Sequence, residues 1–520
     1  MPCAPFASRA DPQDKRCVQQ AGEFDYVLLS DVHLGSDLVT HSRPWAATSW
    51  LTQEAAVDQQ LVSLLAHHRR TRTDGRPLCV VMAGDFLDLV GVSLPLPRTA
   101  MRTAPTAEEE RCGLGSAPDH VVHKMWAIAE RHPRVFRALM ELLAEGNRLV
   151  LVRGNHDIEL HWHAAQRAFV EAVVQHAPAS LRDELASRIA IQPWFFAVEG
   201  LLYVEHGHQF DAMCSYGDPL LPTCPLDPRR IRSVPFSVLL RNVARPTRGL
   251  STARYEHGSF GCYFGLLLAL GLSGSVRIAV RFARATSRLV GTWVAHMQGE
   301  GKRRRHQLCA RKARFAARES VPPERLRELE QLYVRPAAHS LSFVLRSLYL
   351  DRALALALAL LCVVSGALLA RYRDALEGVL CALPAALFAT YACIGIDRGI
   401  SPTHGMQTGA VRIAALFSAR WVVMGHTHQP VVQPLGEGAH YVNLGHWGED
   451  DLPEERGDSA TTSCTYLHLR LDGEHYRADF MRWDAERGPA TAHLSSEPDT
   501  CPKNPDGRLL GGLAKPQSAA

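Results

Sequence analysis

The sequence contains 13 cysteines in 520 residues, but no Cys-x-x-Cys pair and no regular cysteine spacing. Several of them, such as Cys79, Cys262, Cys362 and Cys393, stand inside apolar runs. This pattern argues against a zinc knuckle and a disulfide framework, and it is typical of buried free thiols in a reducing compartment. Residues 1–20 also lack an apolar core, so we do not expect a secretory signal there.

The chain has little net charge, because 57 Lys and Arg residues stand against 53 Asp and Glu residues and leave a formal charge of +4. This balance indicates no particular partner, and we expect no nucleic acid. The cations are concentrated between Arg229 and Arg327, most densely at residues 302–305. That stretch could lie against phosphates or an anionic membrane surface, or it could be a solvated helical face.

Apolar strands followed by helices or loops occupy residues 23–210, and strands resume in residues 410–485. The expected strands are 26–29, 78–83, 148–152, 201–204, 421–424, 441–443, 464–471 and 475–483. The expected helices are 52–70, 121–145 and 164–186, with a long loop over 91–120. This pattern predicts an α/β sandwich that is interrupted by a helical, Arg-rich insertion over 211–409. Residues 1–22 are predicted to be a flexible N-terminus, and residues 486–520 a disordered tail.

Polar side chains follow five of these strands, at the strand ends where α/β proteins usually place their sites. The five clusters are Asp31-x-His33, Gly84-Asp85-x-x-Asp88, Gly154-Asn155-His156-Asp157, His206-Gly207-His208 and Gly425-His426-x-His428. Each cluster alone could arise by chance, but five clusters after five strands indicate one shared site. Gly425 would permit a sharp bend that turns the two following histidines toward one point.

In their order and residue types, the five clusters resemble those of the calcineurin-like metallophosphoesterase family. The resemblance covers residues 25–210 and 410–485 and does not extend to the insertion. It implies a four-layer α/β/β/α sandwich and a centre of two divalent metal ions. The implied ligands are carboxylate, imidazole and amide groups without a thiolate, which suit Mn, Fe, Zn or Co better than Ca. The implied ligands of the first metal are Asp31, His33, Asp85 and His428, and those of the second are Asp85, Asn155, His206 and His426, with Asp85 as the bridge.

The same resemblance implies hydrolysis of a phosphoester by a hydroxide held between the two metals. His156 would protonate the leaving oxygen, and Asp88 would orient His156. Asn155, His156 and Arg153 would contact the substrate. For Arg153, a structural salt bridge is the alternative.

Within the family, residues 28–35, 206–207, 423–430 and 442–445 are similar to the UDP-2,3-diacylglucosamine pyrophosphohydrolases of lipid A synthesis. That branch also has a helical insertion, which binds acyl chains, before its last His-x-His. It usually has Arg where His156 stands and Asp where His208 stands, and its insertion is shorter. The expected substrate is therefore a phosphorylated small molecule or lipid, carrying a lipid-linked or membrane-proximal phosphate or pyrophosphate. A non-catalytic membrane scaffold that carries a phosphoesterase fold is the remaining alternative.

Two apolar runs within the insertion suggest a membrane. Residues 353–370 carry no charge, and residues 379–396 are interrupted only by Pro384. As helices, each run would span about 27 Å, close to the thickness of a bilayer core. We therefore expect a possible membrane hairpin over 353–396 and a protein at the cytoplasmic side of the cell membrane. A buried helical pair within a soluble cap is the alternative.

Overall fold

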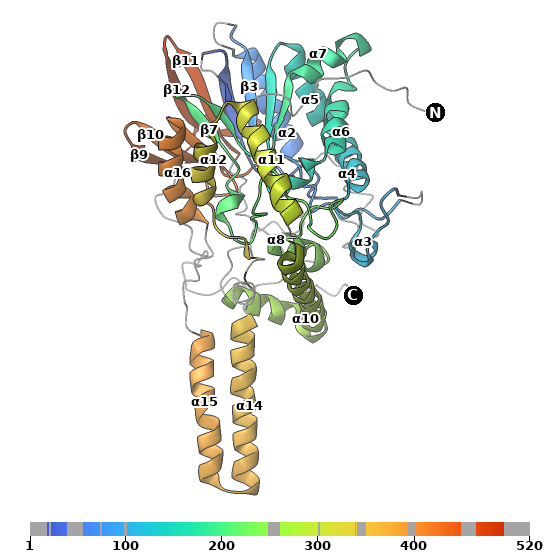
Figure 1. The fold of residues 1–520 in the computed structure, drawn as a ribbon, viewed down its shortest axis with the longest axis vertical. Coiled ribbons are helices and arrows are strands. Elements are labelled where there is room, and N and C mark those ends of the chain that lie inside the picture. Colours follow the sequence, from blue (N-terminus) through green and yellow to red (C-terminus); the bar gives the residue numbers. More distant parts are fainter. Residues whose placement is uncertain are drawn as a thin grey trace, which may run out of the picture. The chain divides into compact units, whose positions relative to one another are not determined.

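The computed structural model describes residues 18–19, 22–38, 56–72, 75–97, 101–247, 260–299, 302–337, 340, 350–393, 402–448 and 464–492. Within these residues the protein is an α/β protein with two mixed sheets (Figure 1). The chain divides into two compact units. The first comprises Met1–His206, Leu239–Ala285 and Ile413–Ala520, and the second comprises Gly207–Val238 and Thr286–Arg412. Both sheets belong to the first unit.

The larger sheet has seven strands in the order β13-β12-β11-β2-β3-β4-β5. Their bounds are β2 (Asp25–Leu29), β3 (Leu78–Ala83), β4 (Arg148–Val152), β5 (Ile189–Gln192), β11 (Thr465–Asp472), β12 (His475–Asp484) and β13 (Gly488–Thr491). Strands β2 to β5 are parallel, and β11 to β13 continue the sheet in antiparallel pairs. The parallel strands are almost entirely buried, which explains their nearly continuous apolar sequences.

The smaller sheet has six strands in the order β1-β6-β7-β8-β10-β9. Their bounds are β1 (Val18–Gln19), β6 (Phe196–Val198), β7 (Leu202–Val204), β8 (Trp421–Met424), β9 (Val431–Gly436) and β10 (Ala439–Asn443). Strands β7 and β8 pair in parallel, with Val204 opposite Val423. The chain therefore leaves this sheet and returns to it at two neighbouring strands.

Two hydrophobic clusters fix the layers of the first unit. One cluster joins the sheets face to face, with Leu28 and Val81 from the larger sheet and Val204 and Val423 from the smaller. The other covers the opposite face of the larger sheet with helices. Those helices are α2 (Ala56–Arg70), α4 (Pro118–Arg131), α5 (Pro133–Ala144) and α6 (His163–Val174). On the smaller sheet, Phe417 at the end of α16 (Thr403–Phe417) packs against the rings of Phe195 and Tyr203.

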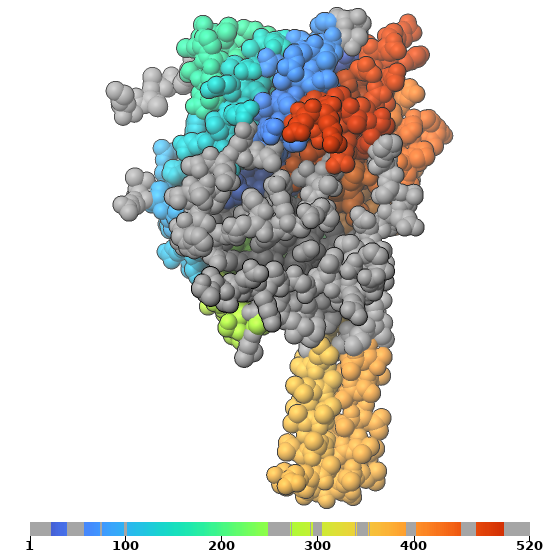
Figure 2. Space-filling model, turned by 180° about the vertical axis from the view of Figure 1, so that it is seen from behind, coloured from blue at the N-terminus to red at the C-terminus, as the bar shows by residue number. Residues whose placement is uncertain are grey.

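The described part of the second unit is mainly helical. Its longer helices are α11 (Lys302–Glu319), α12 (Pro323–Gln331), α14 (Leu350–Tyr372) and α15 (Ala375–Cys393). Helices α14 and α15 form a hairpin and lie against each other along their length (Figure 2). Their backbones approach closely, because a Cβ on Gly366 or Gly378 would lie 2.6 Å from the carbonyl oxygen of the other. The hairpin exposes many large apolar side chains, among them Leu354, Leu360, Leu361, Leu376, Leu383 and Leu387.

Among the described helices, one segment, Leu354–Tyr372, is long and apolar enough to cross a membrane. The apolar part of α15, Ala375–Tyr391, is shorter and contains Pro384. Residues 394–396 of the predicted hairpin lie outside the described residues. The hairpin geometry agrees with the sequence prediction, whereas its lipid environment stays a prediction.

Several predicted element boundaries were wrong. The helix expected over 121–145 begins at Pro118 and is interrupted at His132, because Pro133 has no N–H to continue the hydrogen-bond ladder. The helix expected over 164–186 is split into α6 and α7 (Arg182–Ser187). The loop expected over 91–120 contains α3 (Ala107–Cys112), which begins with a capping box at Thr106.

Five short strands, β1, β5, β6, β9 and β13, were not predicted. The flexible N-terminus was wrong at Val18–Gln19, which pairs with β6, and the disordered tail was wrong at Gly488–Thr491, which pairs with β12. Residues 1–17 and 493–520 lie outside the described residues. Short edge strands depend on the partner strand more than on their own side chains, so periodicity does not reveal them.

The insertion is also less uniform than predicted. Its described residues contain an isolated bridge between Thr223 and Ile231 and no strand, as expected. However, Leu239–Ala285 groups with the two flanking segments and not with the rest of the insertion. This stretch includes a π-helix, Leu240–Ala244, and part of α10 (Phe260–Gly299), which is kinked at Gly271.

Candidate metal centre

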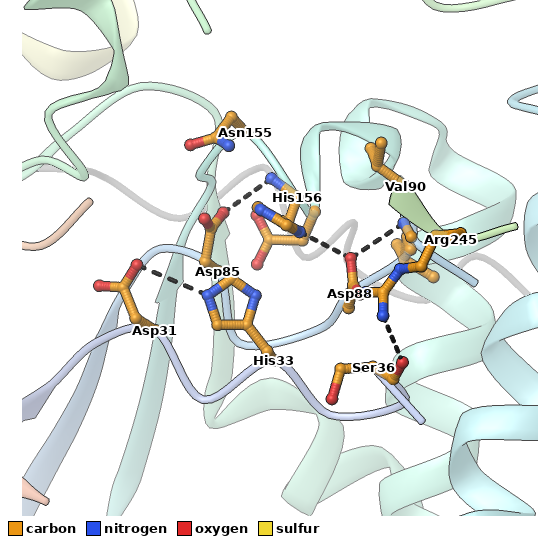
Figure 3. A network of polar contacts seen from close by, with 12 residues as sticks. Asp31, His33, Ser36, Asp85, Asp88, Val90, Asn155, His156 and Arg245 are labelled. Atoms are coloured by element: carbon orange, nitrogen blue, oxygen red, sulfur yellow. Dashed lines mark hydrogen bonds and ion pairs between the residues drawn. The ribbon is translucent and has the colours of Figure 1, made fainter. Parts of the chain in front are cut away.

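The structure brings the five predicted clusters together at the carboxyl ends of five strands. β2, β3 and β4 are parallel neighbours in the larger sheet, while β7 and β8 are parallel neighbours in the smaller one. Figure 3 shows the side chains that follow β2, β3 and β4 lying close together. The gathered residues are Asp31, His33, Asp85, Asp88, Asn155, His156, His206, His426 and His428.

His206 is held in one orientation by a backbone contact. Its Nδ1 lies 3.0 Å from the carbonyl oxygen of Ala83, so Nδ1 carries the hydrogen of that bond. The other ring nitrogen, Nε2, lies 3.0 Å from Oδ2 of Asp85 and 3.0 Å from Oδ1 of Asn155. Two oxygens thus face one ring nitrogen, an arrangement that a second ring proton or a cation would satisfy. The residues therefore fit a metal ion, and the Ala83 carbonyl is the kind of partner that orients a ligating histidine.

A second group forms around Oδ1 of Asp31. Nε2 of His428 lies 3.2 Å from this oxygen, and Nε2 of His33 lies 3.7 Å from it. Potential ligand atoms of the three residues all lie within 4.8 Å of one another. The other oxygen of Asp31, Oδ2, accepts the backbone N–H of His426 at 3.1 Å. The first and fifth clusters are therefore bound to each other directly.

The carboxylate of Asp85, in the second cluster, contacts residues of the third and fourth clusters. Its Oδ2 faces His206, and its Oδ1 accepts the backbone N–H of His156 at 2.8 Å. Asp31, Asp85 and His206 also present ligand atoms within 4.8 Å of one another. The carboxylate predicted to bridge two metals thus contacts residues of the third and fourth clusters and lies near Asp31 of the first.

The backbone is strained where these residues stand. Nine described residues other than glycine have a positive φ, and five of them are Asp31, His33, Asp85, His426 and His428, with values between 51° and 70°. Such conformations are uncommon for residues with a Cβ and persist only where the surroundings enforce them. This concentration of uncommon backbone conformations is a second feature, beside the residue types, that singles out the cluster.

The predicted role of Gly425 was wrong in its physical reason. The left-handed backbone occurs at His426 and His428, and Gly425 itself is not in that region. Gly425 is instead required by close approach, because a Cβ there would lie 2.0 Å from Oγ of Ser30 and 2.3 Å from Oδ2 of Asp31. The absence of a side chain at 425 allows the His-x-His turn to lie directly against the first cluster.

The cluster combines buried carboxylates with imidazoles. Burial alone would raise the pKa of Asp85 and Asp31, but His206 and neighbouring histidines hold both well below the usual range. Conversely, burial would lower the pKa of His206, yet Asp85 and Asp31 raise it to about 9. The buried carboxylates and imidazoles of the site thus stabilise each other's charged forms.

His156 forms a dyad with Asp88. Nδ1 of His156 lies 2.6 Å from Oδ1 of Asp88, and the same oxygen accepts the N–H of Gly91 at 2.9 Å. The second oxygen of Asp88 forms an ion pair with Arg245. Burial would raise the pKa of Asp88, but Arg245 and His156 together lower it to about 2. The predicted partner of His156 is therefore present and ionised.

Three residues of the site have positions or contacts that the sequence did not predict. Asp157 accepts N–H groups from Gly154 at 2.6 Å and Phe86 at 3.0 Å, which ties the second and third clusters together. Asn443 donates to the Gly425 carbonyl at 2.6 Å and so fixes the last turn. Asp157 follows a predicted strand and Asn443 ends one, which was a usable signal. Arg245 had no local signal, because it lies within the predicted insertion.

Arg153 is buried, and its guanidinium is directed at backbone. Its Nη2 donates to the Pro193 carbonyl at 2.8 Å, and Nη1 lies 3.4 Å from Nδ1 of His161. These hydrogen bonds favour a structural role for Arg153.

In comparisons with known proteins, no family model matches this chain, and no curated protein shows significant similarity to it. The chemistry of the site therefore rests on its own residues and geometry.

Proposed function

We propose that this protein is a two-metal-dependent phosphoester hydrolase with the four-layer α/β/β/α metallophosphoesterase sandwich. The observation that carries the proposal is the convergence of five carboxylate, imidazole and amide clusters on one strained, buried site. Two sheets packed face to face, with helices on the outer face of the larger one, support the sandwich.

The proposed ligands follow the two groups of contacts. Asp31, His33 and His428 would hold the first ion, whereas Asn155, His206 and His426 would hold the second. Asp85 would serve both ions. Oxygen and imidazole ligands without a thiolate favour Mn, Fe, Zn or Co.

Bound divalent ions would neutralise the phosphoryl oxygens and make water a stronger nucleophile. The protein's own residues supply orientation and proton transfer. Asp88 fixes Nδ1 of His156, so Nε2 is the atom that would donate a proton to the leaving oxygen. The Asn155 amide, which lies beside His206, would contact a phosphoryl oxygen.

The proposed substrate is a phosphorylated small molecule or lipid, met at the cytoplasmic side of the cell membrane. The apolar exterior of the α14–α15 hairpin supports the membrane part of this proposal. A UDP-2,3-diacylglucosamine pyrophosphohydrolase-like activity is the narrower candidate, favoured by the motifs around Asp31 and His426. His156, where that branch has Arg, argues against it. A non-catalytic scaffold is disfavoured because all proposed ligands and the His156–Asp88 dyad are present.

The test is Asp85→Ala, assayed with Mn²⁺ and bis-p-nitrophenyl phosphate alongside measurement of bound metal. Hydrolysis should fall to background, and bound manganese should fall from two ions per chain. Asp472→Ala, which removes an exposed carboxylate at the end of β11, is the matched control and should keep both. Turnover that survives in Asp85→Ala would overturn the two-metal account.

A further inference from the structure

Asp88 is buried and has a second partner besides His156. One oxygen of its carboxylate accepts from His156 and from the N–H of Gly91, and the other is paired with Arg245. Arg245 also donates from Nη1 to the carbonyl oxygen of Ser36 at 2.8 Å (Figure 3). Ser36 lies three residues after His33, in the loop that follows β2. Arg245 thus joins the carboxylate of the dyad to the loop of the first cluster.

We propose that Arg245 is a positioning residue that holds Asp88, and through it His156, in the geometry needed to protonate the leaving group. The inference rests on the proposed hydrolase function. Arg245 acts through another side chain and does not itself touch the reacting atoms.

The physical reason lies in the burial of Asp88. Its side chain is 0% exposed, and a buried carboxylate is unfavourable unless both of its oxygens are paired. Arg245 places a permanent positive charge beside Oδ2 of Asp88. A guanidinium that binds Oδ2 also prevents the carboxylate from rotating, so Oδ1 stays directed at the imidazole.

The contact is close enough to restrict its neighbours. A Cβ at Gly91 would lie 2.2 Å from Oδ2 of Asp88 and 2.5 Å from Nη2 of Arg245. Position 91 therefore has no room for a side chain while the pair is formed. A methyl group at this position would disturb the same contact from the opposite side.

The polypeptide around Arg245 is fixed to residues 108–114, in α3 and just after it. Arg245 directly follows the π-helix Leu240–Ala244, a wide helical turn often found at functional sites. Arg241 in that turn donates to the carbonyls of Gly113 at 3.1 Å and Leu114 at 2.9 Å. Asn242 donates to Oε1 of Glu108 at 3.1 Å. These contacts hold the turn before Arg245 in place, so that Arg245 lies beside the dyad although it is far from Asp88 in the sequence.

The test compares leaving groups, because a defect in leaving-group protonation depends on the leaving group and a general folding defect does not. The probes are p-nitrophenyl phosphate and phenyl phosphate with their methyl diesters, in Mn²⁺. The p-nitrophenolate ion departs readily without a proton, whereas phenolate needs one. We expect Arg245→Gln to reduce kcat for the phenyl esters at least about 10-fold and for the p-nitrophenyl esters less than about 3-fold. Arg245→Lys should recover part of the loss.

Arg284→Gln is the matched control, because it removes an exposed arginine of the same insertion, on α10, that has no part in the contacts around Asp88. It should affect both leaving groups equally. Gly91→Ala should reproduce the selective loss of Arg245→Gln. If Arg245→Gln does not fold, Arg245→Lys and Gly91→Ala provide the test instead. Equal losses of kcat for both leaving groups in these two variants would overturn the proposal.

The failure of this inference can be separated from failure of the proposed function. His156→Ala and Asp88→Asn should show the same dependence on the leaving group. If they show it and the Arg245 variants do not, Arg245 has no positioning role. If wild-type protein hydrolyses none of the probes and no related phosphoester, the hydrolase proposal itself fails.

Discussion

Nζ of Lys124 lies 2.7 Å from Oε2 of Glu159, and neither side chain is more than 4% exposed. Lys124 comes from α4 and Glu159 from the turn after the third cluster. The same ammonium group donates to the carbonyl oxygen of Leu89, the residue after Asp88, at 2.7 Å. The buried Lys124 side chain therefore binds both the loop that carries Asp88 and the turn after the third cluster.

Lys124→Met should lower the free energy of unfolding by about 3–5 kcal/mol, because it leaves the Glu159 carboxylate buried without its partner. Lys124→Met combined with Glu159→Leu should lose less, since no charge is then left buried. Urea unfolding of the three proteins at equal Mn²⁺ concentration checks this. A double variant less stable than the single one would contradict the account.

Gly425→Ala should weaken metal binding more than it weakens the fold. Its Cβ would press on Asp31 and Ser30, so Asp31 would have to move while the two sheets keep their packing. We expect the affinity for Mn²⁺ to fall about 10- to 100-fold, as for other changes that displace a ligand indirectly. Titration calorimetry measures it. Gly291→Ala, where a Cβ meets nothing within 4 Å, is the control and should bind Mn²⁺ normally.

Stability should fall in acid because of a histidine pair remote from the site. Burial, aided by the nearby His468, His67 and Arg470, lowers the pKa of His68 to about 2, and burial lowers that of His468 to about 4. In the unfolded chain both would titrate near 6.5, so the unfolded state binds more protons below that pH. The contribution of these two histidines to the free energy of unfolding is therefore fully present above pH 6.5. It is lost as the pH falls toward 4, by about 1.4 kcal/mol per pH unit for His68.

Urea midpoints measured between pH 7.5 and 5 test this prediction. His68→Phe combined with His468→Tyr should flatten the pH dependence, because the aromatic contacts with Tyr466 can remain while the protonation sites are lost. An unchanged slope in the double variant would assign the acid sensitivity to other groups.

Replacing residues 350–393 with a short Gly-Ser linker should release the protein from membranes, since the apolar exterior of α14 and α15 is removed. Fractionation with a high-salt wash and an alkaline carbonate wash measures the effect. The full chain should resist both washes, and the shortened chain should be soluble and keep Mn²⁺-dependent hydrolysis. Full-length protein found in the soluble fraction would contradict the membrane hairpin.

The sequence predicted the buried strands well because each is a continuous apolar run closed by a polar cluster. Thus Leu78–Ala83, Arg148–Val152 and Trp421–Met424 occur where they were expected. The gathering of Asp31, Asp85 and His206 also followed from their common position after strands. These features depend on local pattern and on the rule that parallel strands share their carboxyl edge.

Features that depend on distant partners were not predictable. β1 and β13 form because an open sheet edge is available to them, and their own sequences carry little strand signal. Arg245 reaches Asp88 across 157 positions of sequence, and no pattern around Arg245 distinguishes it from other arginines of the insertion. The left-handed backbone at His426 likewise depends on contacts with Asp31 that only the folded chain provides.

The parallel pairing of β7 with β8 has a consequence for the order of synthesis. His206 leaves the ribosome 220 residues before His426, which at roughly 5–20 residues per second is on the order of 10 to 40 s. Throughout that interval β7 has no β8 neighbour, and its backbone forms an open edge of the smaller sheet. The nascent chain therefore passes through a period with an incomplete site and an open strand edge, during which β7 is exposed to mispairing and to chaperone binding.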